Sequence, residues 1–223
     1  MESQMLTIIV IAKECLPGRV KTRLTPELSF EQAAAVASAS LADTLDAIRA
    51  VPATRRILAF DGRPSYAPAE AHGFEIIPQA DGDLSDRLAA IFDQCSGPTL
   101  LVGMDTPQVN RQVLEPALGD WSGELDAWFG FASDGGFWAL ALADPDGSLI
   151  RGVPMSRPDT GRLQLERLLD AGLRVKLLPV LTDVDTVDDA AEVAEIAPDG
   201  RFAEAVSRAF ADNLVGARSA AAA

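Results

Sequence analysis

Cysteine and histidine are scarce in this sequence, and their scarcity excludes several kinds of site. The 223 residues include two cysteines, Cys15 and Cys95, and one histidine, His72. No redox or metal-ligand spacing joins the cysteines, so we expect neither a disulfide framework nor a cysteine-based metal site. Cys15 lies near the candidate site described below, but no base stands beside it in the sequence. We therefore interpret it as an incidental loop thiol rather than a nucleophile.

Basic charge and long apolar runs are scarce as well. Lysine and arginine number 19 against 33 aspartates and glutamates, so the net charge is −14 and the chain has no general attraction for nucleic acid. The N-terminal apolar run Met5–Ala12 is too short to span a bilayer and follows no basic segment, which argues against a membrane span and a signal peptide. We expect a cytoplasmic protein without a nucleic-acid or membrane partner.

Composition and length are those of a single folded domain. Hydrophobic residues make up 48% of the chain and charged residues 23%, which allows a sizeable core. No internal repeat and no linker is evident. We assign residues 1–214 to one α/β domain and expect the tail, residues 215–223, to be disordered.

Apolar runs that predict strands alternate along the chain with amphipathic runs that predict helices. This order favours a largely parallel sheet with helical crossovers. Strands are expected at Leu6–Ala12, Arg56–Phe60, Phe74–Ile77, Thr99–Gly103, Ala127–Ala132, Phe137–Ala143 and Arg174–Val180. Helices are expected at Ser29–Val51, Asp83–Cys95, Arg111–Leu118, Thr160–Ala171, Thr186–Ala197 and Arg201–Leu214, the first beginning in a capping box of Ser29 and Gln32.

A basic loop follows the first predicted strand. It holds four cations and one acid, Glu14; the cations are Lys13, Arg19, Lys21 and Arg23. Ligands of open parallel sheets bind at the carboxyl ends of the strands, so a phosphate at this loop would meet the cationic side chains and the backbone N–H groups near Gly18. The alternative is a solvated loop that balances nearby acids. Neither a Walker A motif nor a Gly-x-Gly-x-x-Gly turn is present.

Carboxylates stand where predicted strands end. Asp105 follows the strand Thr99–Gly103, and a carboxylate there suits Mg²⁺ or Mn²⁺ that also binds phosphate oxygens. The alternative role for Asp105 is a cap of the next helix. Asp134 precedes two glycines that allow positive φ and close approach of a ligand, and its alternative role is a plain turn.

Two more acidic positions come at the starts of predicted helices. Asp185, in the segment Thr182-Asp183-Val184-Asp185-Thr186, would be able to reach a metal, but we favour an N-cap. Asp83 is expected to cap its helix, and we interpret Arg87, on the same helix, as a surface residue rather than a phosphate ligand.

Four motifs occur in a characteristic order. They are Pro17-Gly18-Arg19-Val20-Lys21-Thr22-Arg23-Leu24, Gly103-Met104-Asp105-Thr106-Pro107, Asp134-Gly135-Gly136-Phe137-Trp138 and Asp183-Val184-Asp185-Thr186. Together, over about Leu6 to Ala197, they resemble a bacterial family of GT-A-fold, glycosyltransferase-like proteins with a branch linked to arsenosugar biosynthesis. The sequence is also similar to 2-phospholactate guanylyltransferases and to molybdenum-cofactor nucleotidyltransferases.

The resemblance implies a single Rossmann-like nucleotide-diphospho-sugar transferase domain, with a mostly parallel, mixed sheet flanked by helices. It also implies that Lys21 and Arg23 contact phosphates, that Asp105 is the metal and nucleotide carboxylate, and that Asp134 lines the acceptor side. Two departures are evident. A complete Asp-x-Asp is missing at Asp105, and the first loop lacks the Gly-x-Gly-x-Arg signature of many nucleotidyltransferases.

We therefore expect a metal-dependent glycosyltransferase that uses a nucleotide-sugar and a small-molecule acceptor. The alternatives are a nucleotidyltransferase that joins a nucleoside triphosphate to a phosphorylated small molecule, and a non-catalytic nucleotide-binding protein. A homodimer is left open. The expected catalytic residues are Asp105 and Asp134, the metal ligands for Mg²⁺ or Mn²⁺ are Asp105 and Asp185, and the nucleotide-binding residues are Lys13, Gly18, Arg19, Lys21 and Arg23.

Overall fold

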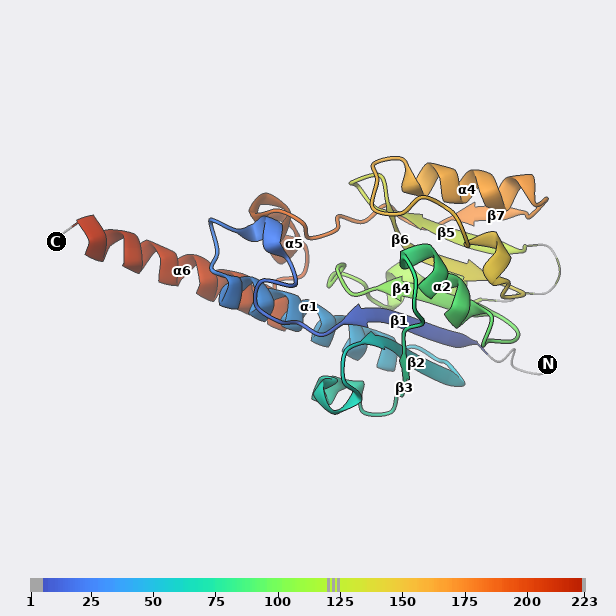
Figure 1. Ribbon diagram of the computed structural model, residues 1–223, viewed down its shortest axis with the longest axis horizontal. Helices are drawn as coiled ribbons and strands as arrows, with labels where there is room; N and C mark the ends of the chain where they lie inside the picture. The colour runs from blue at the N-terminus through green and yellow to red at the C-terminus, as the bar shows by residue number, and fades with distance from the viewer. Residues whose placement is uncertain (1–5, 120, 122, 124, 222–223) are drawn as a thin grey trace.

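The computed structural model has a seven-stranded sheet with helices on both faces (Figure 1). It describes the backbone of residues 6–119, 121, 123 and 125–221, and the side chains of these residues as far as residue 213. The strands are β1 (Thr7–Lys13), β2 (Arg55–Asp61), β3 (Glu75–Pro78), β4 (Thr99–Gly103), β5 (Ala127–Phe131), β6 (Phe137–Leu142) and β7 (Val175–Leu177). They lie in the order β3-β2-β1-β4-β6-β5-β7.

The sheet is mixed and mostly parallel, as predicted. β1 pairs in parallel with β2 and β4, β2 with β3, and β5 with β7, whereas β6 runs antiparallel to β4 and β5. The chain builds β1, β2 and β3 outward to one side and then crosses to β4 on the other side of β1. Because the strand order reverses between β1 and β4, a crevice is expected at the carboxyl ends of these two strands.

The helices follow the predicted order along the chain. They are α1 (Phe30–Arg49), α2 (Leu84–Phe92), α3 (Arg111–Leu114), α4 (Thr160–Asp170), α5 (Val187–Ile196) and α6 (Arg201–Ala221), with short 3-10 turns η1 (Thr22–Leu24), η2 (Pro64–Tyr66), η3 (Ala69–Ala71), η4 (Glu115–Leu118) and η5 (Gly147–Leu149). Ser29 and Gln32 form the expected capping box of α1, and Asp83 caps α2. None of the helices in the described part of the chain is long and apolar enough to cross a membrane.

Alternating side chains of the sheet enter two different cores. Ile8 and Val10 of β1 are fully buried with Leu41 and Leu45 of α1 on one face. Ile9, between them, points to the other face, where α2 and α4 cover the sheet. This alternation follows from the two-residue period of a strand, and it explains why the central strands read as continuous apolar runs.

A third core fixes the basic loop. Leu24 and Leu28, which follow the loop's last cation, are buried together with Val193 of α5 and Phe202 of α6. In Figure 1 this core lies beside the start of α1, where α5 and α6 meet it. The loop that precedes Leu24 is therefore anchored at both ends, by β1 and by this core, although it has little regular structure of its own.

Several element boundaries differ from the predictions. β7 is limited to Val175–Leu177, because Pro179 has no N–H to continue the ladder. The helix expected at Arg111–Leu118 is α3 followed by η4, since Pro116 interrupts α-helical hydrogen bonding. The backbone of α6 is helical to Ala221 rather than to Leu214. The disorder expected for residues 215–223 and the limits of the single domain stay predictions, and residues 222–223 lie outside the described part.

The turn between β5 and β6 is docked on the start of α4. Gly135 has φ +90°, and a Cβ on it would lie 1.9 Å from the carbonyl oxygen of Pro158. The Gly161 N–H donates to the Gly135 carbonyl at 2.8 Å. The positive φ expected in this turn is confirmed at Gly135, but the close approach is to the protein's own backbone and not to a ligand.

Alanine at this glycine is predicted to destabilise the fold through the clash. Gly152 is a matched control, because it has φ +79° and nothing would lie within 4 Å of an added Cβ. Gly152→Ala is expected to cost about 1 kcal/mol of backbone strain, and Gly135→Ala roughly 3 kcal/mol or more, since overpacking adds to the strain. Urea unfolding of both variants measures the difference; equal losses would contradict this packing.

Candidate functional site

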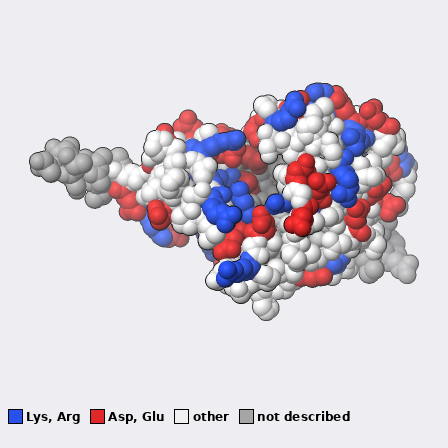
Figure 2. All heavy atoms as spheres, viewed as in Figure 1, with Lys and Arg blue, Asp and Glu red and all other residues white. Residues whose placement is uncertain are grey.

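A cleft of about 610 Å³ opens at the carboxyl ends of β1 and β4, at the predicted crevice. Figure 2 shows a hollow between the part of the molecule formed by α1, α5 and α6 and the body of the sheet. Lysine and arginine side chains gather beside the hollow on the side of α1, α5 and α6. A smaller pocket of about 240 Å³ adjoins the cleft under the basic loop. The two share Lys13, Arg23, Met104, Asp105 and Asp185 as lining residues.

Lys21 links the basic loop to the carboxylates of the cleft. Its Nζ lies 2.7 Å from Oδ1 of Asp105 and 3.4 Å from Oδ1 of Asp185, and its side chain is only 7% exposed. Burial alone would lower the pKa of Lys21, but the charge and the hydrogen bond of Asp105, with a further contribution from Asp185, outweigh burial and raise it. Lys21 is therefore a buried, charged ammonium shared by two carboxylates.

The backbone at Lys21 is held in an unfavourable conformation. Its φ of 47° and ψ of 38° place it in the left-handed region, which a non-glycine residue adopts at a cost of roughly 1–2 kcal/mol. Val20 and Leu24 on either side of it are buried, and so fix the path of the chain through this point. The ion pairs and the flanking apolar contacts together offset the strain.

Asp105 is positioned through its backbone from two sides. The buried hydroxyl of Ser40 in α1 donates to the carbonyl of Met104 at 2.7 Å, and the Val184 N–H donates to the carbonyl of Asp105 at 3.2 Å. The next helix, α3, is capped by Asn110. The alternative of Asp105 as a helix cap is therefore excluded, and its side chain faces Lys21.

Asp185 also faces the basic loop, and the favoured interpretation of it as an N-cap is wrong. Thr186 caps α5 in a capping box with Asp189, because its hydroxyl is one residue nearer to the first turn. The carboxylate of Asp185 is left to accept from Lys21 and from Arg23, whose guanidinium contacts its other oxygen.

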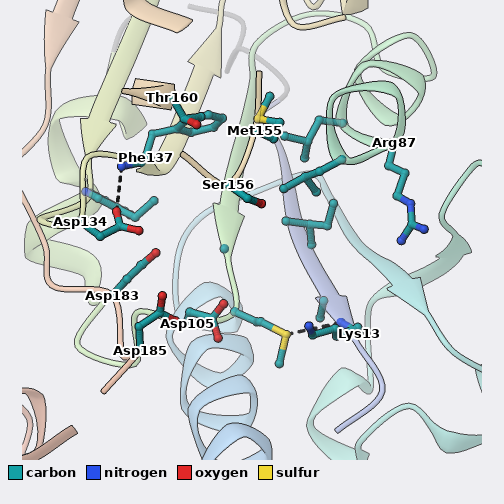
Figure 3. A pocket seen from close by; sticks show the side chains of 18 of the residues that line it. Lys13, Arg87, Asp105, Asp134, Phe137, Met155, Ser156, Thr160, Asp183 and Asp185 are labelled. Carbon is teal, nitrogen blue, oxygen red and sulfur yellow. Dashed lines mark hydrogen bonds between the residues drawn. The ribbon is translucent and has the colours of Figure 1, made fainter. Parts of the chain in front are cut away.

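Asp134 and Asp183 complete a group of four carboxylates in the cleft, with Asp105 and Asp185 (Figure 3). One oxygen of Asp134 accepts from the Gly136 N–H at 2.8 Å, so the turn interpretation holds for that oxygen, while the side chain lines the cleft. Partial burial and then the charge of Asp105, with smaller contributions from Asp134 and Asp185, raise the pKa of Asp183 to about 7. The concentration of negative charge around Asp183 would be relieved by a bound cation.

The residues fit a metal that shares its ligands with a substrate. Among the residues that the structure describes, no three histidine, cysteine or acidic side chains are grouped closely enough to form a metal cage. Asp105 and Asp185, however, both contact the ammonium of Lys21 and both line the cleft, so a metal in the cleft would have two carboxylates close by. Mg²⁺ sites commonly use one or two carboxylates and take the remaining oxygens from phosphate and water.

The structure places three of the five predicted nucleotide-binding residues at the cleft or at the pocket that adjoins it. Lys13 and Arg23 line the cleft, and Lys21 lines the adjoining pocket. Gly18 and Arg19 line neither: an added Cβ on Gly18 would face the ring of Phe30, and Arg19 is exposed. The expected approach of a phosphate to the backbone near Gly18 stays a prediction.

Arg87 belongs to the cleft wall rather than to the outer surface. Its guanidinium donates to Asp61 at 2.8 Å and to the carbonyl of Gly82 at 3.1 Å, and it lines the cleft beyond Lys13 (Figure 3). Gln79 beside it donates to the carbonyls of Ala12 and Ala59. In the sequence, the polar segment after the third predicted strand was the one feature that could have indicated Arg87 and Gln79 as cleft residues.

A loop between β6 and α4 supplies cleft residues that sequence reasoning missed. Met155, Ser156, Arg157 and Thr160 line the cleft on the side of Phe137. The Thr160 hydroxyl accepts from the Arg157 N–H and donates to the carbonyl of Pro154, which closes the loop. Their sequence carries no recognisable motif, and the docking of this loop on the turn between β5 and β6 brings them to the cleft.

The fold is shared with solved nucleotide-dependent transferases. A proposed nucleotide-diphospho-sugar transferase from Desulfovibrio desulfuricans G20 aligns over 92% of this chain and 97% of its own, with a TM-score of 0.78 and 23% identity. The CMP:2-keto-3-deoxy-manno-octonic acid synthetase complexed with CTP aligns over 87% of this chain and 98% of its own, with a TM-score of 0.56 and 14% identity. The 4-diphosphocytidyl-2C-methyl-D-erythritol synthase of Anaerococcus prevotii DSM 20548 aligns over 88% of this chain and 100% of its own, with a TM-score of 0.54 and 11% identity. The predicted fold class is thus confirmed.

The sequence itself decides the family. Residues 44–157 match the profile described as "Uncharacterized protein conserved in bacteria (DUF2064)". The chain belongs to this family. The matched segment runs from α1 to Arg157 and so contains Asp105 and Asp134. No curated protein matches the chain, and the arsenosugar link and the two named nucleotidyltransferase families stay predictions.

Cys15 is not a nucleophile at neutral pH. Its thiol donates to the carbonyl of Lys13, and partial burial followed by the charge of Asp105 raises its pKa from 9.0 to about 11. The interpretation of Cys15 as an incidental thiol agrees with this environment, because the reactive thiolate is disfavoured.

Alkylation kinetics test this environment directly. In a Cys95→Ser variant, iodoacetamide at pH 8 is expected to modify Cys15 about 100-fold more slowly than free cysteine, since the pKa shift lowers the thiolate fraction by that factor. The rate should keep rising with pH beyond 9, and the urea-unfolded variant, as a control, should react at the ordinary rate. A plateau of the folded protein's rate below pH 9 would contradict the shift.

Proposed function

We propose that this protein is a metal-dependent glycosyltransferase that takes a sugar from a nucleotide-sugar and passes it to a neutral small-molecule acceptor. The observation that carries the proposal is the uneven charge of the cleft. Lys13, Arg23 and Arg87 face one part of it and the buried ammonium of Lys21 lies beneath, so that four cations meet three acids there, Asp61, Asp105 and Asp185. An anionic diphosphate suits this part.

The opposite part of the cleft suits an uncharged acceptor. It is lined by Asp134, Asp183, Phe137 and Met155, and its single cation, Arg157, is held by Asp159 in two contacts of 3.0 and 3.2 Å. A phosphorylated acceptor would bring negative charge next to Asp134 and Asp183 with no free cation among the described lining residues of this part. An acceptor hydroxyl meets no such repulsion.

In the proposed reaction the acceptor oxygen bonds to the anomeric carbon of the sugar. The bond from that carbon to the diphosphate breaks, and its electron pair leaves with the diphosphate, which Lys21 and Arg23 bind. Asp134, whose first oxygen is held by the Gly136 N–H, accepts the proton of the acceptor hydroxyl at its second oxygen. Asp105 and Asp185 would hold Mg²⁺ or Mn²⁺, which when bound supplies positive charge that stabilises the leaving diphosphate.

Nucleotidyl transfer is the second candidate. It is favoured by the fold shared with the synthetase complexed with CTP. In this reaction a phosphorylated acceptor would attack the α-phosphate of a nucleoside triphosphate, and pyrophosphate would leave. Release of pyrophosphate from a triphosphate would support this candidate and count against glycosyl transfer. A non-catalytic nucleotide-binding role, a cytoplasmic location and a homodimer remain predictions without a specific observation in their favour.

Ligand-induced thermal stabilisation tests the proposal. With Mn²⁺ or Mg²⁺ present, a panel of UDP-, GDP-, ADP- and dTDP-sugars is expected to include one that raises the melting temperature by mass action. Lys21→Met and Arg23→Met are each expected to weaken its binding by about 10- to 100-fold, since each removes a charged contact of about 1.5–3 kcal/mol.

Arg19→Met is the matched control. It removes one cation from the same loop, but Arg19 lines neither the cleft nor the adjoining pocket, so nucleotide affinity should stay within about twofold of the wild type apart from ionic screening. Should no nucleotide-sugar raise the melting temperature of the wild type with either metal, the proposed donor is wrong. Equal losses in Arg19→Met and Arg23→Met would show that general charge, and not the cleft, binds the nucleotide.

A further inference from the structure

We infer that the acceptor subsite takes a ring with an apolar face, such as an uncharged pyranoside, and that Phe137, Met155 and Ser156 recognise it. The inference rests on the proposed function and names the acceptor's chemical class. It starts from Figure 3, where these three side chains lie together on the side of the cleft away from Lys13.

An apolar lip forms the first part of this subsite. Phe137 at the start of β6 and Met155 are only partly buried although both are large and apolar, and Leu84 of α2, which lines the same cleft, is 41% exposed. Partly exposed apolar side chains within a polar-rimmed hollow are typical of ligand-binding grooves. A sugar ring presents C–H groups on one face, so it can cover such a lip and still keep its hydroxyls toward polar groups.

Ser156 supplies the second, independent observation. It is a non-glycine residue at φ +58°, a conformation that glycine would adopt without strain. The loop around it is closed by the Thr160 hydroxyl and docked on Gly135, so the strain is imposed from both sides. The conformation carries the serine hydroxyl into the middle of the cleft, between Met155 and the carboxylates (Figure 3). Strained residues of this kind are concentrated at ligand-binding sites.

The charges that line this part of the cleft determine which class of ring it binds. With Arg157 held by Asp159, the lining of this part of the cleft has unpaired acidic groups at Asp134 and Asp183 and a neutral hydroxyl at Ser156. An anionic acceptor is repelled by Asp134, and a purely apolar one leaves the Ser156 hydroxyl and the second oxygen of Asp134 without a partner. A neutral ring with hydroxyls on its edge and an apolar face satisfies all of these groups.

Ligand-observed NMR on the full chain tests the subsite without knowledge of the donor. The probes are methyl β-D-glucopyranoside, glycerol, which has hydroxyls but no ring, and glycerol 3-phosphate, which is anionic. The pyranoside is expected to bind more tightly than either. Ser156→Gly and Met155→Ala should each weaken it about 3- to 10-fold, the loss expected for a neutral hydrogen bond or a comparable apolar contact.

Stability separates a binding role of Ser156 from a structural one. If Ser156 binds the ligand although its backbone is strained, the Ser156→Gly variant should have a melting temperature no lower than that of the wild type. Its affinity for the pyranoside should nevertheless fall. Leu169→Ala, at an exposed leucine of α4 that does not line the cleft, is the control for Met155→Ala and should leave pyranoside affinity unchanged.

Tighter binding of glycerol 3-phosphate than of the pyranoside, or equal pyranoside affinity in wild type, Ser156→Gly and Met155→Ala, would overturn the inference. Titration of UDP, GDP, ADP and dTDP, each with Mn²⁺, into the same samples keeps the two claims apart. If none of these nucleotides binds the wild type, the proposed function is contradicted, whereas nucleotide binding together with unaltered pyranoside affinity in the variants contradicts only the acceptor class.

Discussion

The buried ammonium of Lys21 between Asp105 and Asp185 is the contact on which the rest of the site depends. Three segments far apart in the sequence meet at this one group: the loop after β1, the end of β4 and the segment before α5. Taking the Lys21 ammonium out of water costs free energy, which its two carboxylate partners offset, and removal of a partner would leave a buried charge uncompensated. Lys21 also lines the smaller pocket that adjoins the cleft, and in the proposed function it binds the diphosphate as well as holding the fold.

Much of the fold follows from local sequence. Apolar runs and the caps at Ser29 and Asp83 predict most strands and helices to within a few residues, and the βα order predicts the parallel sheet and its crevice. The ends of α3 and β7 differ from the predictions because a single proline, Pro116 or Pro179, interrupts the hydrogen bonding of the element. Local patterns give the kind of element reliably, while its exact end depends on single residues and on neighbouring strands.

The site could be predicted only in part. Asp105 and Asp134 come just after strands and Lys21 lies in the loop that follows β1, and strand ends of a parallel sheet meet in space. Asp185 was misread because Asp and Thr are both good N-caps, and the sequence does not say which of two adjacent residues takes the position. Ser156 and Met155 carry no local signal at all, since their place in the cleft results from the docking of one loop on Gly135.

A double-mutant cycle between Lys21→Met and Asp105→Asn, measured by urea unfolding, tests the central contact most directly. If Lys21 holds the carboxylate segment in place, the two losses of stability are strongly non-additive, with a coupling free energy of about 1 kcal/mol or more. Losses that add to within about 0.5 kcal/mol would contradict the account. The basic loop and the strand-end carboxylates would then be neighbours without a shared anchor.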